Sequence, residues 1–173
     1  DCEVVISPDH MVFMHDNPLR GLVRGGTFIV QSNLEPKVFW ASLPRRARDI
    51  IREKQINLFI LDAFKVAEDR APNPDLRTRM MGVAFIGAVA TKVDRIAKGA
   101  NEAAMLEKIR EQITKKFGSK GAAVVEANME VVRDGAALAR RVDYETLSDE
   151  DLPRAPLPPL NPALSAQMCS RAP

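Results

Sequence analysis

Three arginines at the start of a predicted helix have the clearest capacity to bind a ligand. Arg45, Arg46 and Arg48 follow Leu43-Pro44 and open a helical segment over residues 45–54. The first N–H groups of a helix carry partial positive charge, so basic side chains beside them attract a phosphate or an acidic partner surface. The alternative is an exposed basic helix end that is only solvated. We expect any cofactor or partner contact on this chain to use Arg45, Arg46 and Arg48.

The residue types needed for catalysis or metal binding are sparse. His10 and His15 flank an apolar run in the loop expected after the first strand, a position where α/β proteins often place working residues. Neither histidine has a carboxylate or cysteine partner at a useful spacing. Cys2 and Cys169 stand alone at opposite ends of the chain, with no CxxC motif. We therefore expect structural or solvent roles for the histidines, no catalytic residue and no metal site.

Gly25-Gly26 is the most glycine-rich spot in the chain, but its context excludes a nucleotide cradle. The pair is predicted to end a short helix over residues 19–24 and to precede a strand over residues 27–31. A dinucleotide-binding fingerprint needs the opposite order, in which the glycines follow a strand and open a helix. The sequence contains no GxGxxG or Walker motif.

Composition excludes several classes of function. The chain has 173 residues, is 46% hydrophobic and 28% charged, and has a net charge of +2. Its basic residues form no aromatic-interleaved patch of the kind that binds nucleic acid. The longest apolar run, residues 80–90, is far shorter than the about 20 residues that span a bilayer. We expect a cytoplasmic protein with neither nucleic acid nor membrane as partner, since the two cysteines fit a reducing compartment.

The apolar pattern predicts an α/β fold with a partial parallel sheet covered by helices. Strands are expected over residues 1–7, 27–31 and 56–61, with helices over residues 45–54 and 63–69 between and after them. Asp62 is placed to cap the second of these helices. From Leu76 onward the pattern predicts a helical C-terminal half without strands. Its three helices are expected over residues 76–97, 102–117 and 120–134, with Ser119 capping the last and Gly135 ending it.

The two ends of the chain suggest its domain organisation. Residues 153–173 hold six of the twelve prolines and no periodic apolar face, which predicts an extended Pro-rich tail. We divide the chain into residues 1–143, the C-terminal part of an α/β domain, and residues 144–173, an arm or linker.

The first strand starts at Asp1, and a buried strand seldom opens a natural domain. The front of the fold is therefore expected to be cleaved, truncated or on another chain.

Four ordered segments carry a resemblance to a known family. They are Asp16-x-x-Leu19-x-Gly21-Leu22-x-x-Gly25-Gly26-Thr27-Phe28, then Leu43-Pro44, then Ile56-Asn57-Leu58-Phe59-x-x-Asp62-Ala63-x-Lys65-x-Ala67, and Lys116-Phe117-Gly118-x-Lys120-Gly121-x-x-Val124-Val125-x-x-Asn128. In this order and spacing, over roughly residues 3–135, they resemble the gamma domain of the pyruvate (2-oxoacid):ferredoxin oxidoreductases. The glycine-rich segment that normally opens that domain is not present before Asp1.

The resemblance implies a component of a large oxidoreductase. Such complexes oxidatively decarboxylate a 2-oxoacid to acyl-CoA and CO2 on thiamine diphosphate with Mg, or run the reverse synthase reaction. Iron-sulfur clusters pass the electrons to ferredoxin or another acceptor. The implied partners are the alpha, beta and delta parts, which hold those cofactors, while the gamma part has a structural role and covers the coenzyme A site. Pyruvate is the favoured substrate, with 2-oxoglutarate and an aromatic 2-oxoacid left open.

The sequence leaves two other functions open. The first is a non-catalytic α/β module that binds a CoA-like phosphate ligand through Arg45, Arg46 and Arg48. The second is an assembly subunit whose Pro-rich arm wraps a neighbouring chain.

Overall fold

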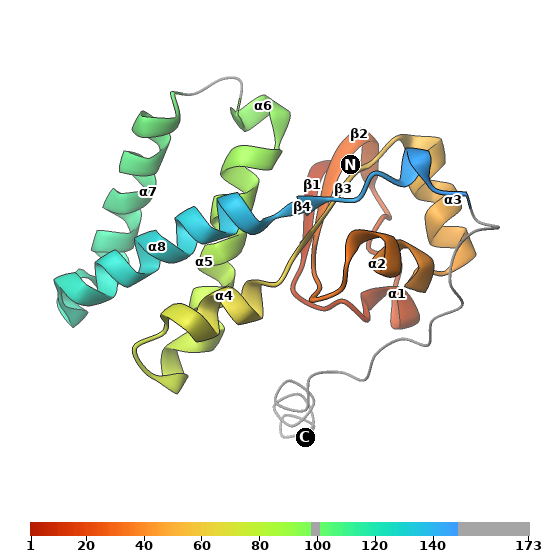
Figure 1. Cartoon of the computed structure of the whole chain (residues 1–173). Helices are drawn as coiled ribbons and strands as arrows, with labels where there is room; N and C mark the ends of the chain where they lie inside the picture. Colours follow the sequence, from red (N-terminus) through yellow and green to blue (C-terminus); the bar gives the residue numbers. More distant parts are fainter. Residues whose placement is uncertain (98–100, 149–173) are drawn as a thin grey trace.

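A computed structural model describes residues 1–97 and 101–148 of the chain. Within these residues a four-stranded sheet has the order β1-β2-β3-β4 (Figure 1). The strands are β1 (Cys2–Ser7), β2 (Leu22–Gln31), β3 (Asn57–Leu61) and β4 (Arg140–Arg141). β1, β2 and β3 run parallel, and β4 pairs antiparallel with β3. The predicted α/β class and parallel sheet are confirmed.

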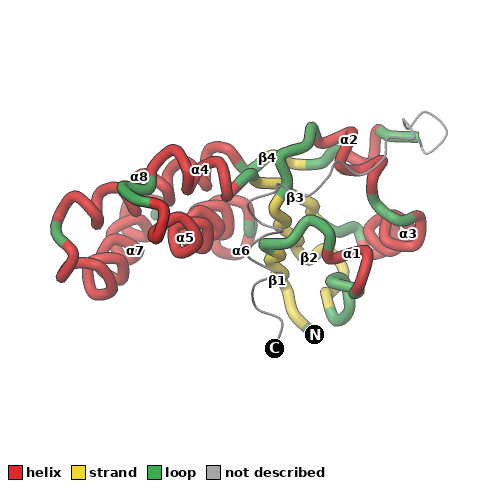
Figure 2. Tube along the Cα trace, turned by 90° about the horizontal axis from the view of Figure 1, so that it is seen from below, coloured by secondary structure: helices red, strands yellow, loops and turns green. Residues whose placement is uncertain are grey.

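Helices lie on both sides of this sheet (Figure 2). They are α1 (Val12–His15), α2 (Pro36–Ser42), α3 (Arg45–Lys54), α4 (Ala63–Arg70), α5 (Pro74–Lys92), α6 (Asp94–Ala97), α7 (Glu102–Phe117) and α8 (Ala122–Leu138). Helices α1, α2 and α3 cover one side, while α4 to α8 form a helical half on the other. The predicted helices over residues 45–54 and 102–117 are confirmed with the same bounds.

Side chains of the central strands alternate between two hydrophobic cores, as buried parallel strands should. Ile29 and Leu61 pack into the core of the helical half. The second core lies on the opposite face, beneath α2 and α3; its strand residues are Phe28, Val30, Leu58 and Ile60. Because both faces are covered, the central strands are apolar along nearly their whole length.

The short helix predicted over residues 19–24 is wrong, because β2 already begins at Leu22. Cys2 pairs with Leu22 whereas Val4 pairs with Thr27, so the extra residues of β2 bulge out between these pairs. Gly25 lies in the bulge with φ +72°, a conformation that favours glycine. Gly25 therefore permits an irregular strand and does not end a helix.

The connecting segments contain more helix than the sequence pattern predicted. Helix α1 occupies the end of the loop expected over residues 7–15, and α2 occupies the segment between Pro36 and Pro44. The long helix predicted over residues 76–97 ends at Lys92, with α6 following as a separate turn. The short helices α1, α2 and α6 lack the length that makes periodicity a strong signal.

The C-terminal predictions need three corrections. Helix α8 continues through Gly135 to Leu138, and its N-terminal boundary is Gly121 with φ +101°, so Ser119 does not cap it. Ser119 lies in the short 3-10 helix Gly118–Lys120. The two-residue strand β4 follows α8, although the pattern predicted no strand beyond Leu76. So short a strand is set by pairing with β3 and not by its own sequence.

A final 3-10 turn, Tyr144–Thr146, returns the chain to the core beneath α2. The ring of Tyr144 stacks on Trp40 with 5.0 Å between centroids, and its hydroxyl donates to the carbonyl oxygen of Ile56 at 2.8 Å. Burial raises the pKa of the phenol. The division of the chain at residue 143 stays a prediction, and the predicted Pro-rich tail over residues 153–173 lies outside the described residues.

Candidate functional site

Polar side chains gather where the parallel strands end. Ser7 closes β1, Gln31 closes β2, and Asp62 follows β3 directly. Ser7 and Gln31 are buried. In open α/β sheets, ligands bind in the crevice outside the carboxyl ends of the strands. This carboxyl edge is therefore the candidate functional site.

Gln31 and Asp62 hold the edge together. The Gln31 Nε2 donates to Asp62 Oδ1 at 3.0 Å, and its Oε1 accepts from the backbone N–H of Phe64 at 3.2 Å. Asp62 Oδ1 also accepts from the backbone N–H of Lys65 at 3.1 Å, which is the predicted helix cap. The start of α4 is thus fixed to the ends of two strands.

A hollow of about 690 Å³ opens beside this edge, between α4, the end of α8 and β4. Its charged lining residues are Asp62, Lys65, Asp69, Arg70, Asp134 and Arg140. The volume is in the range of small-molecule sites, but most of those sites are more apolar.

The cations of the hollow are paired with carboxylates. Arg70 donates to Asp134 at 2.8 Å and to Glu130 at 2.6 Å, and the bond to Asp134 is the main cause of its raised pKa. Lys65 bonds Asp69, which likewise raises the pKa of its ammonium group. A polar ligand that binds in the hollow would have to replace the carboxylate or the cation of one of these pairs.

The chemistry available at this edge is recognition of a polar group. The side chains that line the hollow include no thiol, hydroxyl or imidazole. Across residues 1–97 and 101–148, no group of His, Cys, Asp and Glu side chains could hold a metal ion. The charged lining offers ion pairing and hydrogen bonding to a polar group.

The three predicted arginines lie on the other side of the sheet, at the start of α3. Arg48 donates to the carbonyl oxygen of Leu43 at 2.6 Å, so it supports the turn before its own helix. Arg45 lies 4.0 Å from Asp49 in an exposed i,i+4 ion pair. Arg46 is exposed and lines a separate hollow of about 350 Å³ with Phe13, Met14, Asp16 and Asn17. The structure does not bring the three guanidinium groups onto one target, and their contact with a phosphate or partner stays a prediction.

The histidines and cysteines fall in separate places. His10 lies in the loop between β1 and α1, His15 ends α1, and Cys2 is exposed at the start of β1. Cys169 lies outside the described residues.

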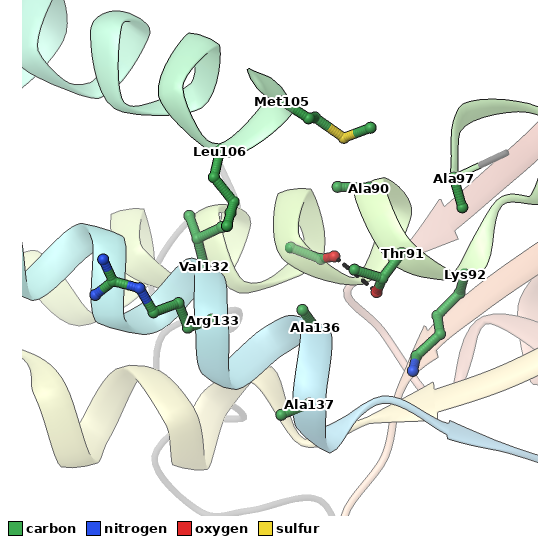
Figure 3. A pocket seen from close by; sticks show the side chains of 11 residues that line it. Ala90, Thr91, Lys92, Ala97, Met105, Leu106, Val132, Arg133, Ala136 and Ala137 are labelled. Atoms are coloured by element: carbon green, nitrogen blue, oxygen red, sulfur yellow. Dashed lines mark hydrogen bonds between the residues drawn. The ribbon is translucent and has the colours of Figure 1, made fainter. Parts of the chain in front are cut away.

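A third hollow, of about 400 Å³, lies within the helical half (Figure 3). Met105 and Leu106 reach into it from α7, and the opposing walls are small: Ala90 on α5, and Ala136 and Ala137 on α8. Its lining is mostly apolar, so it differs in kind from the carboxyl edge.

Sequence reasoning found Asp62 as a helix cap but missed the site around it. Gln31 is a polar residue directly at the end of an apolar strand, and that signal was available in the sequence. Arg70 is far from Asp134 and Arg140 along the chain, and the three residues carry no local signal. Only the packing of α4 against α8 and β4 brings them to one hollow.

The four-stranded sheet, its covering helices and the polar carboxyl edge define a domain of the α/β class. The chain belongs to the pyruvate ferredoxin/flavodoxin oxidoreductase family, which matches residues 1–138. This confirms the resemblance that the four sequence segments indicated.

Two relatives and one solved structure illustrate the similarity. The chain is 31% identical over 114 residues to the pyruvate-flavodoxin oxidoreductase of Trichormus variabilis, covering 66% of this chain and 9% of the relative. The chain is 30% identical over 115 residues to the pyruvate-flavodoxin oxidoreductase of Nostoc sp., covering 66% of this chain and 9% of that relative. The chain therefore spans about a tenth of the length of these relatives.

The solved structure is subunit PORC of the Thermotoga maritima pyruvate oxidoreductase. It matches with a TM-score of 0.52 at 17% identity, covering 83% of this chain and 66% of that subunit. At this identity the match establishes the fold. A search of the described residues for a helix able to cross a membrane found none.

Removing the carboxylate of Asp62 should loosen the carboxyl edge. We expect Asp62→Ala to lower the free energy of unfolding by about 1–3 kcal/mol, since it removes a helix cap and leaves the Gln31 amide without its acceptor. Urea unfolding followed by circular dichroism measures the loss. The control is Asp69→Ala on the same helix, whose exposed pair with Lys65 should contribute much less to stability. Equal losses in both variants would contradict the structural role of Asp62.

Proposed function

We propose that this chain is the gamma component of a thiamine-diphosphate-dependent 2-oxoacid:acceptor oxidoreductase in the cytoplasm. The observation that carries the proposal is the family match over residues 1–138. The relatives' names support pyruvate as the 2-oxoacid and flavodoxin or ferredoxin as the acceptor. The products are acyl-CoA and CO2, and the same complex can run as a synthase.

The role of this chain is structural, and it covers the coenzyme A site. The polar hollow at the carboxyl edge supports contact with a polar ligand or subunit surface. No reaction step is assigned to a side chain of this chain.

Iron-sulfur clusters do not fit the donor groups of the described residues. Thiamine diphosphate with Mg supplies the carbanion chemistry and iron-sulfur clusters carry the electrons. Clusters need several cysteines, whereas the described residues contain only Cys2. We therefore place these groups on alpha, beta and delta partners. Coenzyme A fits better, because Arg46 is exposed beside a hollow and could contact a phosphate.

Purification of this chain from its source tests the proposal. The chain carries an affinity tag, and the eluate is assayed for reduction of a viologen dye that depends on both 2-oxoacid and coenzyme A. We expect co-purifying iron-sulfur chains and activity in the complex, and a colourless, inactive product when the chain is made alone. A stable chain without such partners would contradict the proposal. So would thiamine diphosphate bound to this chain by itself.

The exposure of Arg46 beside its hollow also supports a second candidate function, an independent module for a CoA-like phosphate ligand. Calorimetry of the isolated chain with coenzyme A separates the two. The complex hypothesis expects weak binding or none. The module hypothesis expects saturable binding that Arg46→Ala abolishes and that the exposed control Lys37→Ala leaves intact.

A further inference from the structure

An apolar groove of about 320 Å³ runs along the outer side of the helical half, between α5 and α7. Its floor is made by Val83 and Ile86 of α5 and by Ile109, Ile113 and Phe117 of α7. Helix α7 also packs on α8, where Arg110 bonds Glu126 at 3.0 Å. The two helices α5 and α7 therefore leave an apolar surface between them.

Ile86 marks the open part of this groove. Its side chain is 45% exposed, although the adjacent residues Phe85 and Gly87 are buried. Exposed apolar side chains are common singly, but this one lies in a groove with other apolar residues. Such contiguous patches mark interaction sites more often than isolated residues do.

The polar side chains that line the groove are either positively charged or neutral. They are Lys108, Gln112 and Lys116, and no described carboxylate side chain lines the groove. Lys108, Gln112 and Lys116 follow each other at i, i+4 and i+8, so they form a row along α7 beside the apolar floor. A row of positive charge beside an apolar groove is complementary to a segment that is apolar on one side and acidic at its flank.

Met105 lines this groove and also the small-residue hollow of Figure 3. Ala90 and Ala136 line that hollow, and Lys92 lies at its edge. From Met105 to Phe117 the groove follows α7 for about 18 Å, which is long enough for three turns of a bound helix. Helix-in-groove binding uses apolar anchors spaced at i, i+3 or i+4 and i+7.

We propose that the α5–α7 groove binds an amphipathic helical segment with acidic flanks from another part of the same oxidoreductase. The inference rests on the proposed function. The relatives extend far beyond the matched region, since this chain spans about a tenth of their length, so most of the protein that could supply such a segment lies outside this chain. Apolar anchors of the segment pack on Ile86 and Ile109, and its carboxylates face Lys108 and Lys116.

Photo-crosslinking in the native complex tests this occupant. Position 86 carries p-benzoylphenylalanine, the complex is irradiated in cells, and the crosslinked peptide is identified by mass spectrometry. The expected product is a peptide of an oxidoreductase partner with apolar residues at helical spacing and acidic flanks. The matched control places the same photoreactive residue at Glu111, which is exposed on α7 and does not line the groove, and it should give no such product.

Charge reversal provides a second measurement. Lys108→Glu with Lys116→Glu should lower the crosslink yield about tenfold, because like charges then face each other across the rim. The control is Lys115→Glu with Lys120→Glu, which changes the net charge equally at exposed positions outside the groove and should leave the yield unchanged.

Each remaining outcome overturns the groove proposal. A crosslink to a second copy, to residues 149–173 of this chain, or to a peptide without acidic flanks identifies a different occupant. No crosslink from a chain that co-purifies with active oxidoreductase shows that the groove is empty while the proposed function stands. A chain that co-purifies with no oxidoreductase part removes both proposals, and the affinity purification alone identifies that case.

Discussion

Gly87→Ala is expected to lower the free energy of unfolding by about 3 kcal/mol or more, although it adds only a methyl group. A Cβ atom at Gly87 would lie 2.8 Å from the carbonyl carbon of Val132 and would overlap its oxygen. Gly135→Ala should have a similar effect, since its Cβ would lie 2.7 Å from the carbonyl carbon of Ala84. The obstacle in both cases is backbone, so α5 and α8 would have to move apart. Thermal and urea unfolding of the purified variants measure the loss.

Gly82→Ala is the matched control on the same helix. A Cβ atom at Gly82 meets no heavy atom within 4 Å, and the position is exposed. Alanine is a better helix former than glycine by about 1 kcal/mol, so this variant should be as stable as the parent chain or more stable. If Gly87→Ala proved as stable as Gly82→Ala, the close approach of α5 and α8 would be wrong.

The size of this effect follows from the place of the contact. Helices α5 and α8 lie against each other at the centre of the helical half, and α4 and α7 pack around them (Figure 1). Separating the pair would open the core that also holds Ile29 and Leu61 against the sheet. The α5–α7 groove would be distorted as well, because Val83 and Ile86 are on α5.

Trp40→Ala is the second substitution with a large expected effect, a loss of about 3–5 kcal/mol. The indole is fully buried at 0% exposure, stacks on Tyr144, and lies beneath the Arg52 guanidinium at 5.0 Å. Truncation leaves a cavity in the core beneath α2 and α3 and removes the surface on which the Tyr144–Thr146 turn packs. Circular dichroism during urea unfolding is the appropriate probe, since the variant contains no tryptophan.

Trp40→Phe separates ring packing from the polar part of the indole. The indole N–H has no hydrogen-bond partner among the described residues, so phenylalanine removes a buried unsatisfied donor while keeping an aromatic ring on Tyr144. We expect this variant to lose less than half of what Trp40→Ala loses. Equal losses in the two variants would show that stacking on Tyr144 contributes little.

The sequence alone determined the helices and strands whose apolar residues recur regularly or whose ends are marked by capping residues. Helix α7 was predicted with correct bounds because its apolar residues recur at helical spacing between Asn101 and Gly118. Strand β3 and the cap at Asp62 were predicted because a continuous apolar run ends at an acidic residue. The order and spacing of such segments also determined the family, because those features lie along the chain.

Tertiary structure decided the features that depend on contacts between distant residues. Gly135 has the local appearance of a helix end, but it lies inside α8. Its lack of a side chain leaves room for the backbone of Ala84 on α5. Arg140 and Arg141 have no strand pattern and become β4 only by pairing with β3. The same reason explains why the sequence did not indicate the carboxyl edge as a candidate site.

Arg45, Arg46 and Arg48 are close in sequence yet differ in their surroundings, since Arg48 supports its own turn and Arg46 lines a hollow. Gln31 and Asp62 are thirty-one residues apart and share a hydrogen bond. Proximity along the chain was visible in the sequence, whereas the convergence of side chains requires the packing that folds one segment onto another.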